Sequence, residues 1–338
     1  MEPAGYLAAH AGAALFDRSE RGKIAVAGND RLTYLHAMFT NDIATLRPGG
    51  GCYAAYLTPQ GRMIADLRVL EIGDLALLDL EAPLVPAVLG RLDQFIFAED
   101  VKLGDLTQAF GELSVVGPAA SRVVASVLTL PPGTADLGSW PEYQSARARH
   151  GGETVLLVAS QELGRRGFDL FVERAHLPAL SGALVESGAV PGGHEAAETL
   201  RIEAGRPRFG ADLTSETIPL EAGIESRAIS LTKGCYPGQE VIIRVLHRGH
   251  GRVARKLVGL VVAGPVVPQP GDALTVAERE VGRVTSATWS PLVGEPVALA
   301  YLQRDFLEPG TEVIVAHGAA RLRARVVALP FQPMGAGA

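Results

Sequence analysis

The stretch KGCYPGQEV, residues 233–241, combines the residue types that a reactive thiol needs. Cys235 is one of only two cysteines in the chain, and it follows Lys233 in a turn that contains glycines. Pro237 suits the first turn of a helix, so GQEVIIRVLH is read as a helix that begins just after the cysteine, although its β-branched residues also allow a strand. A nearby cation and free backbone N–H groups stabilise a thiolate. We therefore predict a reactive thiol at Cys235; the alternative is a small buried residue in a tight turn.

The small number of cysteines limits the metal chemistry. Iron–sulfur clusters are normally held by about four cysteine thiolates, and this chain has only Cys52 and Cys235. We expect no cluster held by this chain alone, whereas a cluster shared with a partner stays open. His247 and His250 are spaced His-x-x-His, but no group of cysteines or carboxylates accompanies them. No metal site is therefore predicted.

Asp169 is a candidate for holding a ligand ring. It alternates with Phe168 and Leu170 in GFDLFV, so it projects from the opposite face of a predicted strand. A carboxylate there can accept two parallel hydrogen bonds from the edge of an aminopyrimidinone ring. The alternative is an ion pair with Arg165 or Arg166.

Two further carboxylates have a ligand-binding and a structural interpretation. Asp66 lies in GRMIADLRV, on the strand that leaves a Pro/Gly turn. It either orients a ligand amine or faces solvent beside Arg68. Glu203 lies at the end of a predicted helix, beside Arg206 and Arg208. A structural salt bridge is the simpler explanation for Glu203.

Basic residues are concentrated between positions 233 and 256. This segment holds Glu240 as its single acidic residue, in a protein whose formal net charge is -6. The local excess predicts an anionic partner: a polyglutamate tail, a phosphate or RNA. The alternative is a solvated helix face. The basic residues are Lys233, Arg244, Arg248, Arg252, Arg255 and Lys256.

The elements that must position these side chains form a mixed α+β pattern. Alternating apolar residues predict a strand over 23–27 and three strands within 52–80, with helices after the first and the last of these strands. A second α+β stretch covers about 113–190, and a helix follows over 194–205. After Lys256, short strands separated by Gly/Pro turns predict a small β-barrel.

The composition narrows the class of protein. A chain of 338 residues with 47% hydrophobic residues is long enough for two or three domains with a large core. Its net negative charge argues against a general nucleic-acid binder. Two cysteines fit a reducing compartment. No basic leader or apolar stretch of roughly 20 residues is present, so we expect a cytoplasmic protein that does not enter the membrane.

Several stretches resemble the folate-binding proteins related to the glycine-cleavage T-protein (aminomethyltransferase). In chain order they are FTNDIATL, GRMIADLRV, ETLRIEAGRPRFGADL, KLVGLVV and VTSATWSPLVGEPVALAYL. Within that superfamily, KGCYPGQE is similar to the signature of the YgfZ branch, Lys-Gly-Cys-Tyr-x-Gly-Gln-Glu. The resemblance implies an α+β, T-protein-like ring of three domains. Residues 1–245 would form two interleaved α+β subdomains, the second at about 30–110, and residues 246–335 the β-barrel.

The resemblance also implies a function. It implies a tetrahydrofolate-binding accessory factor that assembles or maintains iron–sulfur proteins, including radical enzymes that modify tRNA. The partners would be iron–sulfur assembly proteins or client enzymes, together with tetrahydrofolate or a one-carbon derivative. The functional motif would comprise Cys235, Lys233 and Tyr236. The expected folate contacts are Asp169, Asp66, Glu203, Gln239 and Arg248.

One position departs from the T-protein pattern. T-proteins carry two adjacent aspartates where this chain has Ala65 and Asp66, and the one taken as catalytic falls at Ala65. Alanine can neither orient a folate amine nor exchange a proton with it. This argues against aminomethyl transfer. A folate-dependent one-carbon (aminomethyl) transferase or demethylase stays the alternative, and an RNA-associated module acting through residues 233–256 is a third.

Overall fold

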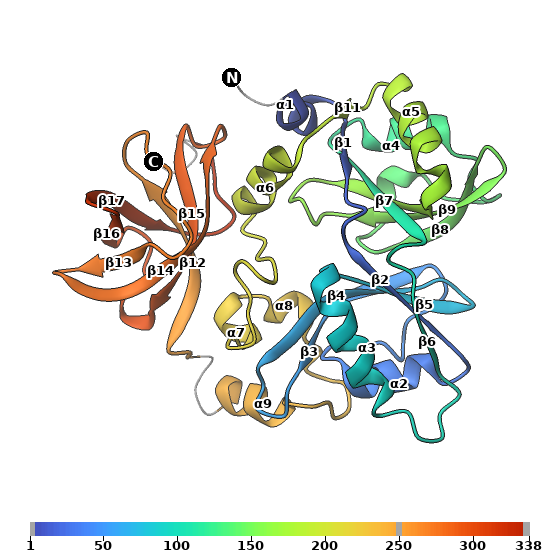
Figure 1. Cartoon of the computed structure of the whole chain (residues 1–338), viewed down its shortest axis with the longest axis horizontal. Helices are drawn as coiled ribbons and strands as arrows, with labels where there is room; N and C mark the ends of the chain where they lie inside the picture. Colours follow the sequence, from blue (N-terminus) through green and yellow to red (C-terminus); the bar gives the residue numbers. More distant parts are fainter. Residues whose placement is uncertain (1–3, 248–251, 334–338) are drawn as a thin grey trace.

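The structure is a computed structural model that describes residues 4–247 and 252–333. Two α+β units and a closed β-barrel lie around a common centre (Figure 1). The predicted α+β fold with a C-terminal barrel is therefore confirmed. Within the two described segments, none of the helices has both the length and the apolar character needed to cross a membrane.

The first unit is a six-stranded sheet whose strands come from two parts of the chain, one before and one after the second unit. Helices α4 (Ala120–Val127) and α5 (Leu177–Glu186) pack on one face through buried aliphatic side chains. The helix α1 (Ala4–Ala11) leads into its strand β1. The strand order is β11 (Val190–Pro191), β1 (Ala14–Asp17), β7 (Phe110–Val116), β10 (Gly167–Glu173), β9 (Glu153–Ser160) and β8 (Ser145–His150).

The second unit is built from the chain between β1 and β7. Helices α2 (Arg31–Met38) and α3 (Val85–Asp93) cover one face of its five-stranded sheet. The side chain of Asp30, at the start of α2, does not cap the helix; its carboxylate accepts a hydrogen bond from the N–H of Asp100. The strand order is β3 (Gly50–Leu57), β4 (Met63–Glu71), β5 (Leu75–Leu80), β2 (Gly22–Ala27) and β6 (Lys102–Asp105).

The faces that these helices leave uncovered meet each other. Tyr53 and Ala55 of the second sheet belong to the same buried cluster as Leu156, Val158 and Phe171 of the first. Strand alternation explains this arrangement, because residues two apart along a strand share a face. Any polar side chain on these inner faces must therefore be paired or must line a cavity.

The barrel closes the third side of the molecule. Helix α6 (His194–Glu203) packs against barrel strand β14, where the hydroxyls of Thr199 and Thr288 lie 2.9 Å apart. Two short helices, α7 (Pro219–Ala222) and α8 (Glu225–Ala228), and α9 (Gln239–His247) precede the barrel. Residues 239–247 are thus helical, so the strand that their β-branched residues also allowed is not formed. The barrel order is β12 (Arg255–Val262), β15 (Glu295–Gln303), β14 (Arg279–Ser290), β13 (Ala273–Val276), β16 (Glu312–His317) and β17 (Ala320–Val327).

Candidate active site

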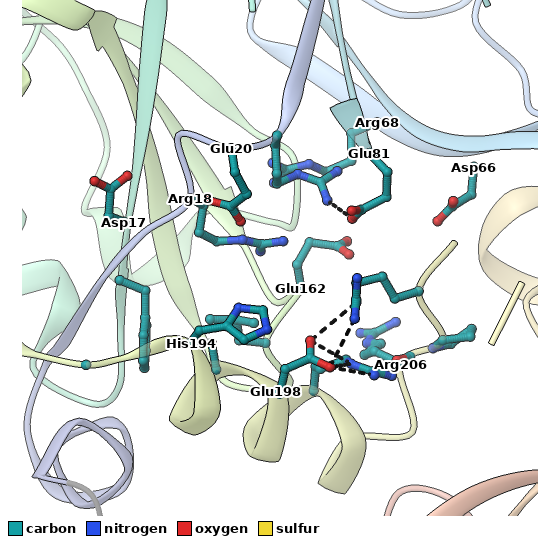
Figure 2. A pocket seen from close by; sticks show the side chains of 18 of the residues that line it. Asp17, Arg18, Glu20, Asp66, Arg68, Glu81, Glu162, His194, Glu198 and Arg206 are labelled. Atoms are coloured by element: carbon teal, nitrogen blue, oxygen red, sulfur yellow. Dashed lines mark hydrogen bonds and ion pairs between the residues drawn. The ribbon is translucent and has the colours of Figure 1, made fainter. Parts of the chain in front are cut away.

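A cavity of about 350 Å³ lies where the two sheets meet the first turn of α6 (Figure 2). Strand β4 contributes Asp66 and Arg68, the segment after β1 contributes Arg18, and the loop between β9 and β10 contributes Glu162. Further charged side chains complete the wall. A cavity of this size with convergent polar groups suits a small polar molecule. The further charged side chains include Glu20, Arg21, Glu81, His194 and Arg206.

Asp66 is the carboxylate that β4 presents to the cavity. The Tyr53 hydroxyl on neighbouring β3 donates a hydrogen bond of 2.8 Å to Asp66 Oδ2. Asp66 Oδ1 is buried and has no hydrogen-bond partner among the described residues. Burial raises the pKa of Asp66 to about 6, although the Tyr53 hydrogen bond lowers it. Because this carboxyl changes its protonation near neutral pH, it is suited to proton transfer.

Ala65 faces the other way. It is fully buried in the core beneath α2, together with Leu35 and Met38. Strand alternation would direct an aspartate at position 65 into this apolar core rather than into the cavity. The argument from Ala65 against aminomethyl transfer is therefore wrong. The aspartate that faces the cavity is Asp66, and this chain has it.

Glu162 is a second carboxylate with a contrasting environment. Burial raises its pKa, but the positive charges of Arg227, Arg68 and Arg206 and the Tyr143 hydrogen bond together outweigh burial and lower the pKa to about 2. Its Oε1 accepts hydrogen bonds from Tyr143 at 2.7 Å and Arg227 at 2.9 Å. The Arg227 guanidinium also lies 4.7 Å over the Tyr53 ring. Two carboxylates whose pKa values are pushed apart are typical of an acid–base site.

Cations are available in the same cavity for an anionic group. Arg18 and Arg206 both line it, and Arg18 points inward (Figure 2). Arg18 Nη1 is buried, and the described residues offer it no hydrogen-bond acceptor. A guanidinium with free donors binds carboxylates by paired hydrogen bonds. The cavity can therefore hold a molecule that has both amine and carboxylate groups.

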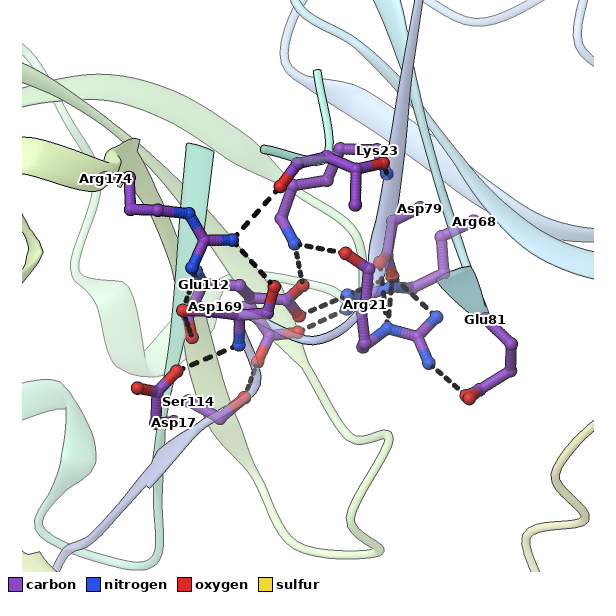
Figure 3. A network of polar contacts seen from close by, with 12 residues as sticks. Asp17, Arg21, Lys23, Arg68, Asp79, Glu81, Glu112, Ser114, Asp169 and Arg174 are labelled. Atoms are coloured by element: carbon purple, nitrogen blue, oxygen red, sulfur yellow. Dashed lines mark hydrogen bonds and ion pairs between the residues drawn. The ribbon is translucent and has the colours of Figure 1, made fainter. Parts of the chain in front are cut away.

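Asp169, which was predicted to hold a pterin ring, does not line this cavity. It is buried in β10, where its carboxylate contacts Arg68 and accepts a hydrogen bond from Ser114 (Figure 3). The ion-pair alternative for Asp169 thus describes its contacts, but the partner comes from the other sheet rather than from the adjacent arginines. The same Arg68 also contacts Asp79 and Glu112. These side chains form a buried charged cluster between the sheets.

Two other predicted folate contacts also lie away from the cavity, and a third falls outside the described residues. Glu203 accepts hydrogen bonds from the hydroxyls of Tyr6 (2.9 Å) and Ser290 (2.6 Å), so it joins α6 to α1 and to the barrel. A salt bridge with the arginines that follow it is not formed among the described residues. Gln239 begins α9 and does not line the cavity. Arg248, like His250, lies outside the described residues.

The KGCYPGQE segment has its own structural roles. Lys233 Nζ donates to the carbonyls of His36 and Phe39 at the C-terminal end of α2, where a cation is stabilising. Burial lowers the pKa of Lys233 to about 8. Tyr236 is buried, and its ring centroid lies 5.0 Å from the Lys233 amine. Cys235 is exposed and does not line the cavity, so the structure does not bring the predicted thiol to it.

Gly238 explains why this segment approaches the β3–β4 turn so closely. Its φ is +83°, and a Cβ added there would lie 2.5 Å from the carbonyl oxygen of Thr58 and 3.0 Å from Cα of Gly61. Any larger residue would push α9 away from the turn. The motif therefore packs against the hairpin that carries Asp66.

The basic segment is partly neutralised by its neighbours. Arg255 pairs with Glu221 at 3.2 Å, and Lys256 lies 3.9 Å from Glu225. Lys233 is directed to backbone carbonyls. The described part of residues 233–256 thus presents less free positive charge than the sequence count suggests, which weakens the RNA hypothesis.

Tyr53, Glu162 and Arg227 were not predicted as site residues from the sequence. Tyr53 could have been found, because the predicted β3–β4 hairpin places it on the face of Asp66, one diagonal step away. Glu162 and Arg227 lie in a loop and in a four-residue helix, where no periodic pattern marks a functional side chain. Only their tertiary contact reveals them.

The fold and the cavity together define a class: proteins with two α+β units and a closed barrel around a cavity lined by charged side chains. Two family models match this chain. One is described as the GCVT N-terminal domain and covers residues 4–233, and the other as the glycine cleavage T-protein C-terminal barrel domain and covers residues 255–332.

Individual relatives and one solved structure agree with these matches. The aminomethyltransferase of Rubrobacter xylanophilus is 32% identical over 94% of this chain and 83% of its own length. That of Halalkalibacterium halodurans is 32% identical over 96% and 87%. The crystal structure of glycine cleavage system aminomethyltransferase T from Bartonella henselae superimposes with a TM-score of 0.86 at 25% identity, covering 97% of this chain and 88% of that one.

The chain belongs to the glycine cleavage T-protein (GCVT) family. This finding corrects the assignment to the YgfZ branch, because the relatives that match nearly the whole chain are aminomethyltransferases. The role in iron–sulfur assembly, with tRNA-modifying enzymes as clients, depended on that branch and is not supported. The side chains of the KGCYPGQE segment have structural roles. Eight residues of this kind are weaker evidence for a function than family matches over residues 4–233 and 255–332.

Proposed function

We propose that this protein is a folate-dependent aminomethyltransferase. It would take the carbon of an aminomethyl group that is bound to a carrier and derived from glycine, and bond it to two nitrogens of tetrahydrofolate. The bonds from this carbon to the amine and to the carrier both break, and the two protons that the folate nitrogens lose leave with the ammonia and the carrier. The family and the relatives' names support the reaction class. The observation that carries the proposal is the cavity-facing Asp66, whose Oδ1 is buried and finds no hydrogen-bond partner in the described part of the chain.

The residues around the cavity fit a reduced folate. Glu162 is ionised and both of its hydrogen bonds end on Oε1, so Oε2 is left to accept an N–H of an aminopyrimidinone edge. Arg18 and Arg206 supply donors for a carboxylate. An amine nitrogen placed at Asp66 would provide the hydrogen bond that Oδ1 lacks. The cavity of about 350 Å³ is large enough for the ring system of a folate.

Asp66 would move the protons of the reaction. Tetrahydrofolate supplies two nucleophilic nitrogens, and each loses a proton when it bonds to the transferred carbon. Asp66, ionised above pH 6, accepts such a proton through Oδ1 while Tyr53 holds Oδ2. Tyr53 thereby fixes the orientation of the carboxylate. Proton transfer by a positioned carboxylate contributes about 10²- to 10⁴-fold to a rate.

The test compares Asp66→Asn with a matched variant, Asp74→Asn. Asp74 is exposed on the turn after the same strand, so its change is chemically equal but distant from the cavity. Binding of tetrahydrofolate is measured by calorimetry without oxygen, and turnover by formation of methylenetetrahydrofolate from an aminomethyl donor. We expect D66N to bind folate within a few-fold of the wild type but to lose about 10²- to 10⁴-fold in turnover.

D74N should match the wild type in both measurements. A wild-type protein that neither binds tetrahydrofolate nor forms product would overturn the proposed function. A D66N protein with the wild-type rate would leave the reaction in place but remove Asp66 from it.

A further inference from the structure

Strand β3 is the edge of its sheet, and it carries Tyr53. On one side, residues 50–57 pair with β4. On the other side no strand follows, so the outward carbonyls and N–H groups of β3 need other partners. The segment after α2, residues 39–42 of the FTND stretch, lies along this edge and supplies them.

Asn41 makes the central contact of this segment. Its side-chain amide donates to the Tyr53 carbonyl at 2.8 Å and to the Arg227 carbonyl at 3.0 Å. Its Oδ1 accepts the N–H of Asp42 at 2.8 Å. One carboxamide thus joins the backbones of two residues that are far apart in sequence. Tyr53 and Arg227 are also the two residues whose side chains stack on each other in the site.

Thr40 repeats the same connection one residue earlier. Its hydroxyl donates to the Ala228 carbonyl at 2.6 Å and accepts the N–H of Ala55 at 2.8 Å. Its backbone N–H donates to the Ala55 carbonyl, and its carbonyl accepts from Ser230. Thr40 is completely buried. Residues 40 and 41 therefore tie β3 to Arg227 and to the residues just after it, Ala228 and Ser230.

We propose that Asn41 is a positioning residue, which holds Tyr53 against Asp66 and Arg227 against Glu162 by fixing the distance between β3 and α8. This inference rests on the proposed function, in which those two carboxylates contact the folate. Asn41 itself does not line the cavity and acts only through its two neighbours. Among the described residues, it is the one side chain that hydrogen-bonds to the backbones of both Tyr53 and Arg227.

Loss of Asn41 has a directional consequence at Asp66. The groups that face this carboxyl are Tyr53, Arg21, Glu81 and Glu162. Tyr53 favours the ionised form by donating a hydrogen bond, whereas Glu81 and Glu162 disfavour it. If Tyr53 moves away with an untethered β3, Asp66 must titrate at a higher pH. A purely structural role for Asn41 would lower stability without moving this titration.

The experiment measures the titration of Asp66 in the free protein, so it does not depend on the reaction. Aspartate carboxyl carbons are labelled with ¹³C and titrated by NMR, and the Asp66 signal is assigned by its absence in D66N. Asn41→Ala is compared with Asn29→Ala, whose side-chain amide contacts only the exposed Asp100. We expect a higher titration midpoint in N41A and an unchanged one in N29A. Turnover of N41A should fall roughly 10- to 100-fold, as misplaced reacting groups do.

A second pair of variants keeps the test decisive if N41A does not fold. Thr40→Val keeps the shape but removes both hydroxyl bonds, whereas Thr40→Ser keeps the hydroxyl. T40V should shift the Asp66 titration in the same direction as N41A, and T40S should not. An unshifted midpoint in folded N41A or T40V overturns the inference. If the midpoint shifts while the wild-type protein forms no methylenetetrahydrofolate, the positioning role stands and the proposed function fails.

Discussion

Asp66 and Arg68 lie two residues apart on the same face of β4, yet they belong to two different kinds of charged site. Around Arg68, each guanidinium nitrogen contacts a carboxylate, and these come from Asp79, Glu112 and Asp169 (Figure 3). Around Asp66, Tyr53 occupies one oxygen and the other is left without a partner among the described residues. The first cluster holds two sheets together, and the second leaves a free atom for a ligand.

The difference lies in hydrogen-bond satisfaction rather than in residue type. Buried polar groups that serve only structure are normally paired. An unpaired buried carboxylate oxygen costs free energy, so one that faces a cavity is a candidate ligand contact. Glu112 Oε2 in the first cluster also lacks a hydrogen bond among the described residues, but it lies 3.5 Å from Lys23 Nζ and does not line the cavity. Asp169 and Asp66 are both acidic residues on inner strands, and both were expected to contact folate. Their partners separate them: Asp169 is saturated by Arg68 and Ser114, whereas Asp66 is not.

The largest effect is expected when the buried cluster loses Arg68, its central cation. Arg68→Met would leave Asp79, Glu112 and Asp169 buried near one another with far less compensating charge. Breaking a buried ion-pair network in this way destabilises by about 3–5 kcal/mol. Urea unfolding should show this loss, or the variant should fail to fold. Arg62→Met is the control, because Arg62 is 46% exposed and pairs only with Glu216. R62M should change stability by less than about 1 kcal/mol.

A stable R68M protein would contradict the comparison, since it would mean that the cluster does not hold the sheets. Equal losses in R68M and R62M would have the same meaning.

The next effect depends on pH and concerns Glu112 within the same cluster. Burial and the nearby charge of Asp79 raise the pKa of Glu112 to about 7, despite Arg68 and Lys23. Because the folded pKa lies above the unfolded value of 4.5, the protonated form stabilises the fold below about pH 4.5. That contribution is lost as the pH rises through 7. Glu112→Gln cannot ionise and should escape this loss.

Relative to E112Q, the wild-type protein should therefore lose up to about 3 kcal/mol of unfolding free energy between pH 4.5 and pH 8. Urea unfolding at pH 5 and at pH 8 measures the difference. Glu153→Gln, at an exposed position on β9, serves as the control and should show no pH-dependent gap. A gap between wild type and E112Q that is the same at both pH values would show that Glu112 is ionised throughout.

The separation in sequence between interacting residues explains which parts of these sites could be predicted. Alternation along residues 63–71 was enough to place Asp66 and Arg68 on one strand, and Gly/Pro turns were enough to predict the barrel. Alternation could not say which carboxylate meets Arg68, because Asp169 lies 101 residues further along and reaches it only when two sheets pack. The motif KGCYPGQE misled for the same reason. Its lysine caps a helix almost 200 residues away in the sequence.

A smaller effect is expected from the partner of the open site. Tyr53→Phe removes the hydrogen bond that lowers the pKa of Asp66. The acid limb of the pH–rate profile should then move up from about 6, by roughly one pH unit for a hydrogen bond of about 1 kcal/mol. Tyr56→Phe is the matched control, because Tyr56 faces the opposite core beneath α2. A limb that moves equally in Y56F would show that the shift is not local to Asp66.

The smallest effect is expected at Cys235, the residue that the sequence placed at the centre of the chemistry. Its side chain is exposed and lies outside the cavity, whereas its neighbours Lys233 and Tyr236 contact the fold. Cys235→Ser should therefore leave turnover within two-fold and stability within about 0.5 kcal/mol of the wild type.

Alkylation of the wild-type protein gives an independent measurement. Burial raises the pKa of the Cys52 thiol to about 12, so Cys235 should react first while turnover persists. If labelling of Cys235 alone stops turnover, an exposed thiol outside the cavity takes part in the reaction. The comparison between the Arg68 cluster and the Asp66 site would then have to include a reacting group that lies outside both.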